Sequence, residues 1–252
     1  MTDVYLTAAG AYLPGEPVTL NPESGLARRI LAANGIRTRH YAAPDELNEQ
    51  LAAEAIERAL KERGLGPEQI GLLATGTTHP DLRVPGFASM VHGRLGGAPM
   101  EILSAGGVCA SSMTALAAAE RALRTGAHDT AVVVGSELAG RHLAGGAGPS
   151  SKRLDEEFLR WTLSDGAGAV VLETRPRPDG LSLRLDWTHL VSYAHEHPAC
   201  MYEQDGRLRQ DVSLLPKVFA QGVEVFNERV KPDEIDHLLC HYSAEKFRAD
   251  LV

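Results

Sequence analysis

The chain has 252 residues, of which 44% are hydrophobic and 23% are charged, enough for one large α/β domain or two small ones. Its formal net charge of −8 argues against a general binder of nucleic acid or of anionic membranes. There is no apolar run of membrane-spanning length, and the N-terminus lacks the basic and apolar regions of a signal peptide.

The cysteines indicate a reducing compartment. There are three of them (Cys109, Cys200 and Cys240), far apart and without a CxxC pair. An odd number at such spacing argues against a disulfide scaffold and predicts a cytoplasmic protein.

In chain order, the first predicted elements are a strand over residues 4–13 and, after an irregular stretch over 17–43, an amphipathic helix that begins at Asp45 and is stopped by Gly64. A strand over 70–75 and a short helix over 87–95 follow. An acidic carrier or a phosphate-bearing cofactor would need a local basic patch in this acidic chain. Candidates in the irregular stretch are Arg28, Arg29, Arg37 and Arg39.

The sequence is organised around residues 100–140, which predict a strand, a glycine turn, a buried helix and a valine-rich buried strand. Cys109 falls in the first turn of that helix, where unpaired N–H groups and the helix dipole favour the thiolate. A cysteine is often a small buried core residue. Core packing does not require a glycine-flexed turn, however, whereas close approach of a substrate does. We therefore predict that Cys109 is a nucleophile.

The remaining residues predict a Gly-rich and then charged loop over 140–160, and a turn containing Gly166 and Gly168 that leads into a buried strand. A linker over 175–180, a long strand over 181–194 and an amphipathic helix over 214–230 follow. His195, His197 and Cys200 have a spacing that could hold a metal, but without a fourth ligand a structural loop is favoured, and no metal site is predicted.

An internal repeat divides the chain. A helix followed by Pro67 and a strand matches a helix followed by Pro232 and a strand predicted over 236–240. We therefore expect an N-terminal half over 1–174 that carries the nucleophile and a partial C-terminal half over 181–252, with the second copy stopping halfway.

Five motifs, in this order, resemble the ketoacyl-ACP synthase III family of the thiolase fold over nearly the whole chain. They are Gly35-Ile36-Arg37-Thr38-Arg39, Gly107-Val108-Cys109-Ala110-Ser111, Val132-Val133-Val134-Gly135-Ser136-Glu137, Ser164-Asp165-Gly166-Ala167-Gly168-Ala169 and Leu238-Leu239-Cys240-His241. The sequences Asn34-Gly35-Ile36-Arg37 and His241-Tyr242-Ser243 are similar to those of the branch that makes dialkylresorcinol- or stilbene-type precursors. The resemblance implies a layered α-β-α-β-α fold built from two pseudo-repeated halves, the second truncated.

The resemblance also implies an acyltransferase of fatty-acid or polyketide biosynthesis that performs a decarboxylative Claisen condensation. An acyl group would move from acyl-CoA or acyl carrier protein onto Cys109, and the enolate of a malonyl carrier would attack it. His241 would donate a hydrogen bond to the thioester oxygen. Arg37 would hold the CoA nucleotide, and Gly166 and Gly168 would let the backbone pass close to the active site.

The family's partners would be acyl carrier protein and a second copy of the chain in a homodimer, with no permanently bound cofactor. Nothing after His241 matches the asparagine that family members place beside this histidine. We interpret the chain as part of an active enzyme, with a degenerate subunit as the alternative.

Two further readings stay open. A cysteine hydrolase of the α/β type would use a similar strand–turn–helix around Cys109 and a later histidine. A non-catalytic partner subunit would keep the thiolase fold for dimerisation alone.

Overall fold

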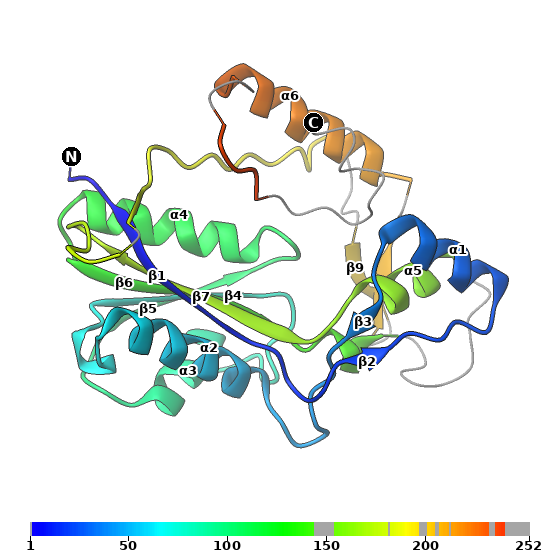
Figure 1. The fold of residues 1–252 in the computed structure, drawn as a ribbon, viewed down its shortest axis with the longest axis horizontal. Helices are drawn as coiled ribbons and strands as arrows, with labels where there is room; N and C mark the ends of the chain where they lie inside the picture. The colour runs from blue at the N-terminus through cyan, green and yellow to red at the C-terminus, as the bar shows by residue number, and fades with distance from the viewer. Residues whose placement is uncertain are drawn as a thin grey trace. The chain divides into compact units, whose positions relative to one another are not determined.

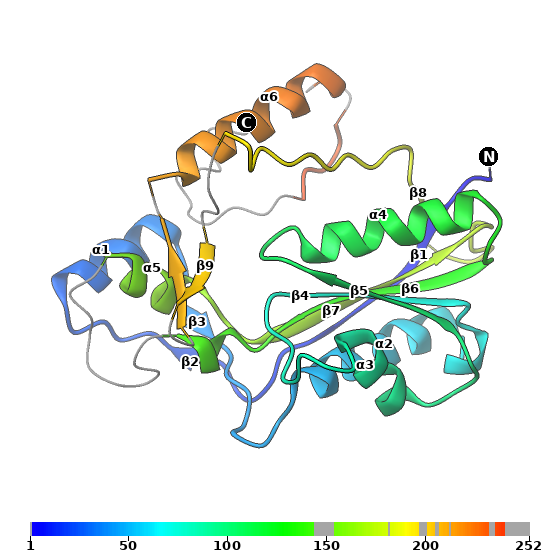
Figure 2. The same cartoon turned by 180° about the vertical axis from the view of Figure 1, so that it is seen from behind.

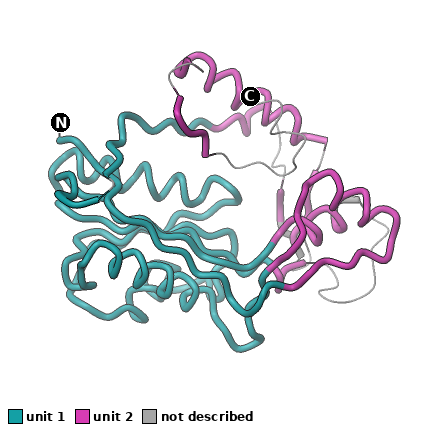
Figure 3. The backbone as a smooth tube through the Cα atoms, viewed as in Figure 1, with its two compact units in different colours: residues 1–17, 40–139, 164–191 teal, residues 18–39, 140–163, 192–252 magenta. Residues whose placement is uncertain are grey.

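The computed structural model describes residues 2–143, 154–180, 182–196, 201–204, 207–211, 213–231 and 235–239. The chain forms two compact units, shown in Figure 3: unit 1 is residues 1–17, 40–139 and 164–191, and unit 2 is residues 18–39, 140–163 and 192–252. These units are defined by contacts in space, whereas the halves 1–174 and 181–252 were inferred from a sequence repeat. The division into halves therefore stays a prediction.

Unit 1 is built on a six-stranded mixed sheet with the strand order β5-β4-β6-β7-β1-β8. Strand β4 pairs in parallel with β5 and β6, while β7 is antiparallel to both β6 and β1. The strands are β1 (Tyr5–Tyr12), β4 (Leu72–Thr77), β5 (Glu101–Gly106), β6 (Thr130–Glu137), β7 (Gly166–Glu173) and β8 (Leu183–Arg184).

Helices cover both faces of this sheet, as Figures 1 and 2 show from opposite sides: α4 (Ser111–Arg124) lies on one face, and α2 (Asn48–Arg63) and α3 (Phe87–Leu95) lie on the other. Alternate residues of β6 supply the two cores. Val132 and Val134 pack in the core of the α2 face, and Ala131 and Val133 in the core of the α4 face. Because both faces are covered, the buried strands are continuously apolar, which is what the valine-rich run predicted.

Helix α2 lies directly on the sheet because β1 has a glycine beneath it. A Cβ at Gly10 would come within 2.4 Å of the Ala55 carbonyl oxygen and the Ala59 nitrogen. The helix ends at Gly64, which adopts the left-handed conformation with a φ of 76°, as the sequence predicted. A short 3-10 helix, Pro67–Gln69, then leads into β4.

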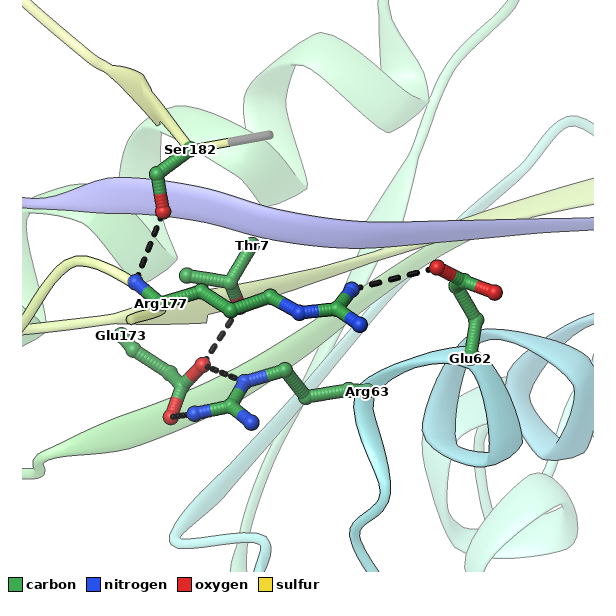
Figure 4. Close-up of polar contacts among 6 residues, drawn as sticks. All are labelled: Thr7, Glu62, Arg63, Glu173, Arg177 and Ser182. Carbon is green, nitrogen blue, oxygen red and sulfur yellow. Dashed lines mark hydrogen bonds and ion pairs between the residues drawn. The ribbon is translucent and has the colours of Figure 1, made fainter. Parts of the chain in front are cut away.

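The far end of α2 is fastened to the sheet by charged groups, which Figure 4 shows in close-up. The Arg63 guanidinium donates to both oxygens of Glu173 at the end of β7, at 2.5 and 3.1 Å. Glu173 also accepts a 2.5 Å hydrogen bond from the Thr7 hydroxyl on β1. A second pair, Arg177 with Glu62 at 3.1 Å, joins the predicted 175–180 linker to the same helix.

Unit 2 contains a buried arginine at the end of β3 (Thr38–Arg39). Arg39 is 2% exposed, donates from Nη1 to the Leu163 carbonyl oxygen at 2.6 Å, and places its guanidinium 5.5 Å from the centre of the Trp161 ring. The elements are α1 (Gly25–Asn34), α5 (Leu154–Thr162), α6 (Leu215–Arg229), the 3-10 turn Ala139–His142, β2 (Val18–Thr19), β3 (Thr38–Arg39), β9 (Met201–Gln204) and β10 (Arg207–Gln210). Arg39 is therefore not part of a surface patch, which corrects that expectation.

Several predicted elements differ from the structure. Helix α1 was missed in the irregular stretch, although Ser24 caps it by accepting from the Ala27 N–H at 3.0 Å and Gly35 ends it. Helix α5 was read as loop, and the β9–β10 hairpin was not anticipated. Helix α6 confirms the helix predicted over 214–230. The described residues 235–239 contain no strand, so the strand predicted over 236–240 is wrong in that part.

The long strand predicted over 181–194 is also wrong, because only Leu183–Arg184 pairs in the sheet. The segment that follows is held by a backbone hydrogen bond from Leu185 to the Val4 carbonyl oxygen, at 2.8 Å, and by side chains. Arg124 donates to the Leu185 carbonyl oxygen at 2.5 Å, and the Thr188 hydroxyl donates to Glu120 at 2.7 Å. In the part of the chain that the structure describes, no helix is long and apolar enough to cross a lipid bilayer.

Candidate active site

Cys109 lies between the end of β5 and the start of α4, and its side chain is exposed. The turn uses Gly107 at a φ of 132°, a conformation that favours glycine. Ala110 is the N-cap of α4 and Ser111 its first residue, so Cys109 lies two residues before the helix and not in its first turn, which corrects the predicted position. The exposed thiol is inconsistent with a buried core cysteine and leaves the sulfur accessible to a substrate.

Two glycines on neighbouring parallel strands let the start of α4 rest on the sheet. Gly76 of β4 and Gly135 of β6 are register partners. A Cβ at Gly76 would lie 2.5 Å from the Ser112 nitrogen, and a Cβ at Gly135 would lie 2.8 Å from the Ser112 Cβ. Glycine inside a strand often marks such a close approach. These residues therefore fix where α4 begins and, with it, where Cys109 lies.

The row of glycines continues into β7, where Gly168 pairs with Gly135. By strand alternation Gly166 and Gly168 share a face with Val170 and Leu172, which pack in the core of the α4 face. Gly168 is exposed, and no atom of the described residues lies within 4 Å of the position a Cβ would take. Both glycines lie within β7 and have no positive φ, so the predicted turn is instead a strand.

Glu137, the last residue of β6, carries a partly buried carboxylate that was not among the predicted site residues. Its Oε1 accepts hydrogen bonds from the backbone N–H and the hydroxyl of Thr78, at 2.6 and 2.7 Å. Burial raises the pKa of Glu137 from 4.5 to about 6, against the opposing effect of these hydrogen bonds. The available sequence signal was its position at the end of the motif Val132-Val133-Val134-Gly135-Ser136-Glu137.

The other predicted site residues lie in unit 2 or outside the described residues. Arg37 is exposed in unit 2, between Gly35 and β3. His241 lies outside the described residues, so its proposed role stays a prediction. His195 is exposed and pairs with Glu196 at 3.1 Å, and His197 and Cys200 also lie outside the described residues. Within the described ranges, no group of three or more His, Cys, Asp or Glu side chains is placed to hold a metal ion.

The mixed sheet between helices, with a cysteine where the edge strand β5 leads into α4, defines a thiolase-like α/β fold. Residues 33–152 match the model of the thiolase N-terminal domain. The predicted fold class is therefore confirmed.

Solved structures with the same fold include two 3-oxoacyl-(acyl carrier protein) synthases III, called FabH. The one from Pseudomonas aeruginosa has a TM-score of 0.79 and 23% identity, covering 99% of this chain and 78% of its own. The one from Xanthomonas oryzae has a TM-score of 0.80 and 22% identity, covering 99% and 80%. A Xanthomonas campestris OleA variant with bound lauric acid and lauroyl-CoA has a TM-score of 0.75 and 18% identity, covering 99% and 80%. The resemblance to the ketoacyl-ACP synthase III group is thus confirmed at the level of the thiolase fold.

Proposed function

We propose that this chain is an acyltransferase that carries an acyl group on Cys109 and condenses it with a malonyl carrier. The observation that carries the proposal is the exposed Cys109 thiol on a glycine turn, beside a row of glycines that keeps side chains away from one face of the sheet. The similarity to FabH and OleA structures supports the same chemistry.

The proposed reaction has two stages. The Cys109 thiolate attacks the carbonyl carbon of an acyl thioester, and the CoA or carrier thiolate leaves and takes up a proton. A malonyl carrier then loses carbon dioxide, and the carbanion equivalent attacks the acyl-cysteine carbonyl and releases the Cys109 thiolate. The product is a β-ketoacyl carrier that is two carbons longer than the acyl group. His241 would donate a hydrogen bond to the enolate oxygen of the malonyl unit.

The proposed substrates are an acyl-CoA and an acyl carrier protein, with no permanently bound cofactor. Gly168 lies on the same sheet face as the start of α4 and leaves that position open among the described residues, which suits passage of a thioester or acyl chain. A relative of the same fold holds lauroyl-CoA. Arg37, exposed at the surface of unit 2, would pair with the CoA phosphates. We further propose a homodimer in the cytoplasm.

The test is transfer of a radiolabelled acyl group to the protein, followed by release of carbon dioxide from malonyl carrier. Cys109→Ala should abolish labelling, and Cys200→Ala, the matched cysteine control, should retain it. His241→Ala should label normally and lose decarboxylation. Labelling of Cys109→Ala, or equal loss of both steps in His241→Ala, contradicts the assigned roles.

The two alternatives are separated by the same assay. The parallel strands β5-β4-β6, followed by β7, which is antiparallel to both β6 and β1, belong to the thiolase-like fold and not to an α/β hydrolase. Hydrolysis would give free acid without chain extension. A non-catalytic partner subunit would take no label on Cys109 at all.

A further inference from the structure

The loop that joins β4 to α3, residues 78–86, begins at the same end of the sheet as the turn that carries Cys109. Thr77, the last residue of β4, is the register partner of Gly106, where β5 ends. The loop exposes two apolar side chains, Leu82 at 59% and Val84 at 77%. Exposed apolar side chains do not pull a loop against the protein core, so other contacts must hold its course.

Hydrogen bonds from three different elements fasten this loop. Ser104 of β5 accepts from the Ala88 N–H at 2.9 Å, just after the loop ends. Asp81, in the loop, accepts from the Asn48 N–H of α2 at 2.5 Å. Glu137 of β6 accepts two hydrogen bonds from Thr78, the first residue of the loop. The contact between Glu137 and Thr78 is the one that lies where the loop leaves the sheet.

Glu137 reaches the loop from the face of the sheet that α4 covers. Gly135 faces Ser112 of α4, and side chains alternate along a strand, so Glu137 points to that same face. Ser136, between them, points to the opposite face, where its hydroxyl donates to the Asn48 Oδ1 at 2.6 Å. The Glu137 carboxylate therefore lies on the side of the sheet that carries the start of α4.

We propose that Glu137 is a positioning residue, whose ionised carboxylate holds Thr78 and so fixes the start of the 78–86 loop beside the nucleophile turn. This role rests on the proposed function for its catalytic meaning, although the anchoring itself does not. Hydrogen bonds to a charged acceptor are about twice as strong as neutral ones, so the hold weakens when Glu137 is protonated. Glu137 belongs to β6. When the loop opens, its carboxylate therefore loses the hydrogen bonds from Thr78 but remains in place between the neighbouring strands.

Other titratable and charged groups lie in the elements at this end of the sheet, and their effect on the loop must be distinguished from that of Glu137. They are His79, Asp81 and Arg83 in the loop, Glu49 on α2, Arg94 on α3, Asp165 before β7 and Cys109 before α4. The pKa of Glu49 is also raised, first by burial and then by its hydrogen bond to Asp81. The matched control is therefore Glu49→Gln, which removes the second titrating carboxyl that contacts the loop.

The experiment is hydrogen exchange of the peptide that covers residues 77–86 in the full chain between pH 5 and 8, corrected for the intrinsic exchange rate. In the wild-type protein, protection should fall about tenfold on acidification with a midpoint near pH 6. Glu137→Gln should show the low protection already at pH 7.5 and no such step, while Glu49→Gln keeps the step. Equal protection and an unchanged step in Glu137→Gln overturn the proposal.

Thr78→Val provides a second variant that leaves the carboxylate in place. It removes one donor to the ionised form, so the pKa of Glu137 rises and the midpoint of the step moves to higher pH. A purely structural effect of the substitution would lower protection without moving the midpoint, and an unmoved midpoint contradicts the proposal.

Acyl loading of Cys109 links the anchor to catalysis. Glu137→Gln should load about tenfold more slowly than wild type at pH 7.5, whereas Glu101→Gln, on the edge strand β5, should load at the wild-type rate. If the wild-type protein takes no acyl group, the proposed function fails while the exchange measurement still decides the anchoring role. Normal loading by Glu137→Gln would overturn the positioning role.

Discussion

Glycine is used in this protein where the backbone of one element approaches the backbone of another. At Gly76 the neighbouring atoms are the backbone of Ser111 and Ser112, which cannot swing aside as a side chain could. A glycine inside a strand lowers its stability relative to alanine by roughly 0.5–1 kcal/mol. The glycine is needed because α4 packs directly on the sheet at this point, and this packing sets the position of Cys109.

We expect Gly76→Ala to displace the start of α4. The added Cβ would meet backbone at 2.5 Å, so the free energy of unfolding should fall by about 1–3 kcal/mol. The rate of Cys109 alkylation by iodoacetamide should change with it. Gly93→Ala is the control, because it lies inside α3 with no described atom within 4 Å of its Cβ position. That variant should be neutral or more stable, and unchanged stability and alkylation in Gly76→Ala would contradict this account.

At the scale of elements, the end of α2 is attached to the sheet by Glu173, which accepts three hydrogen bonds from two side chains, Arg63 and Thr7. The side chains of Arg63 and Glu173 are only 21% and 13% exposed, so solvent screens this ion pair less than it screens a pair at the surface. Glu62 pairs with Arg177 in the same region, but its side chain is 61% exposed. Figure 4 shows the two pairs together and offers a matched comparison.

Glu173→Gln should lower the free energy of unfolding by about 1–3 kcal/mol, because it leaves the Arg63 charge without its carboxylate and weakens the bond from Thr7. Glu62→Gln makes the same chemical change in an exposed pair and should alter stability by less than about 0.5 kcal/mol. Urea unfolding measures both. Similar losses in the two variants would mean that burial does not set the strength of these pairs.

The elements that could be predicted were those whose local pattern agrees with their environment. The valine run of β6, the amphipathic spacing of α2 and the stop at Gly64 are local signals, and the structure confirms them. It also confirms the extent of α6, although that helix buries none of its residues. The 181–194 segment also has a strand-like sequence, but it pairs for only two residues, because hydrogen bonds from Arg124 and Thr188 hold it instead. Such contacts between distant residues leave no local pattern.

The candidate site was predictable in part for the same reason. Cys109 follows two glycines and precedes a helix pattern, all within a few residues. The seating of Ser112 on Gly76 and Gly135, by contrast, depends on strand register, and the burial of Glu137 depends on which strands become neighbours. The long sequence separations involved kept these residues out of the predicted site.

At the scale of the whole molecule, Glu137 makes stability depend on pH with a definite sign. Its folded pKa of about 6 exceeds the 4.5 of the exposed group, so the folded state binds the proton more tightly. This contribution is fully present below pH 4.5 and is lost as the pH rises through 6. A tenfold difference in proton affinity corresponds to about 1.4 kcal/mol, so the contribution is about 1–2 kcal/mol for this half-buried group.

The difference in unfolding free energy between wild type and Glu137→Gln should therefore shrink by about 1–2 kcal/mol, at the expense of the wild type, between pH 4.5 and 7. Taking the difference removes the titration of every other group from the comparison. Chemical denaturation at several pH values measures it. A constant difference across this range would show that Glu137 has the same proton affinity in the folded and unfolded chains.

The strand order has a consequence for how the chain is made. Strand β1 leaves the ribosome before all other strands of its sheet, yet both of its neighbours, β7 and β8, come from residues 166–184. It must therefore wait, with both edges open, until more than half of the polypeptide has been synthesised. During translation, the segment most exposed to mispairing or chaperone capture is thus the one that finishes in the interior of the sheet.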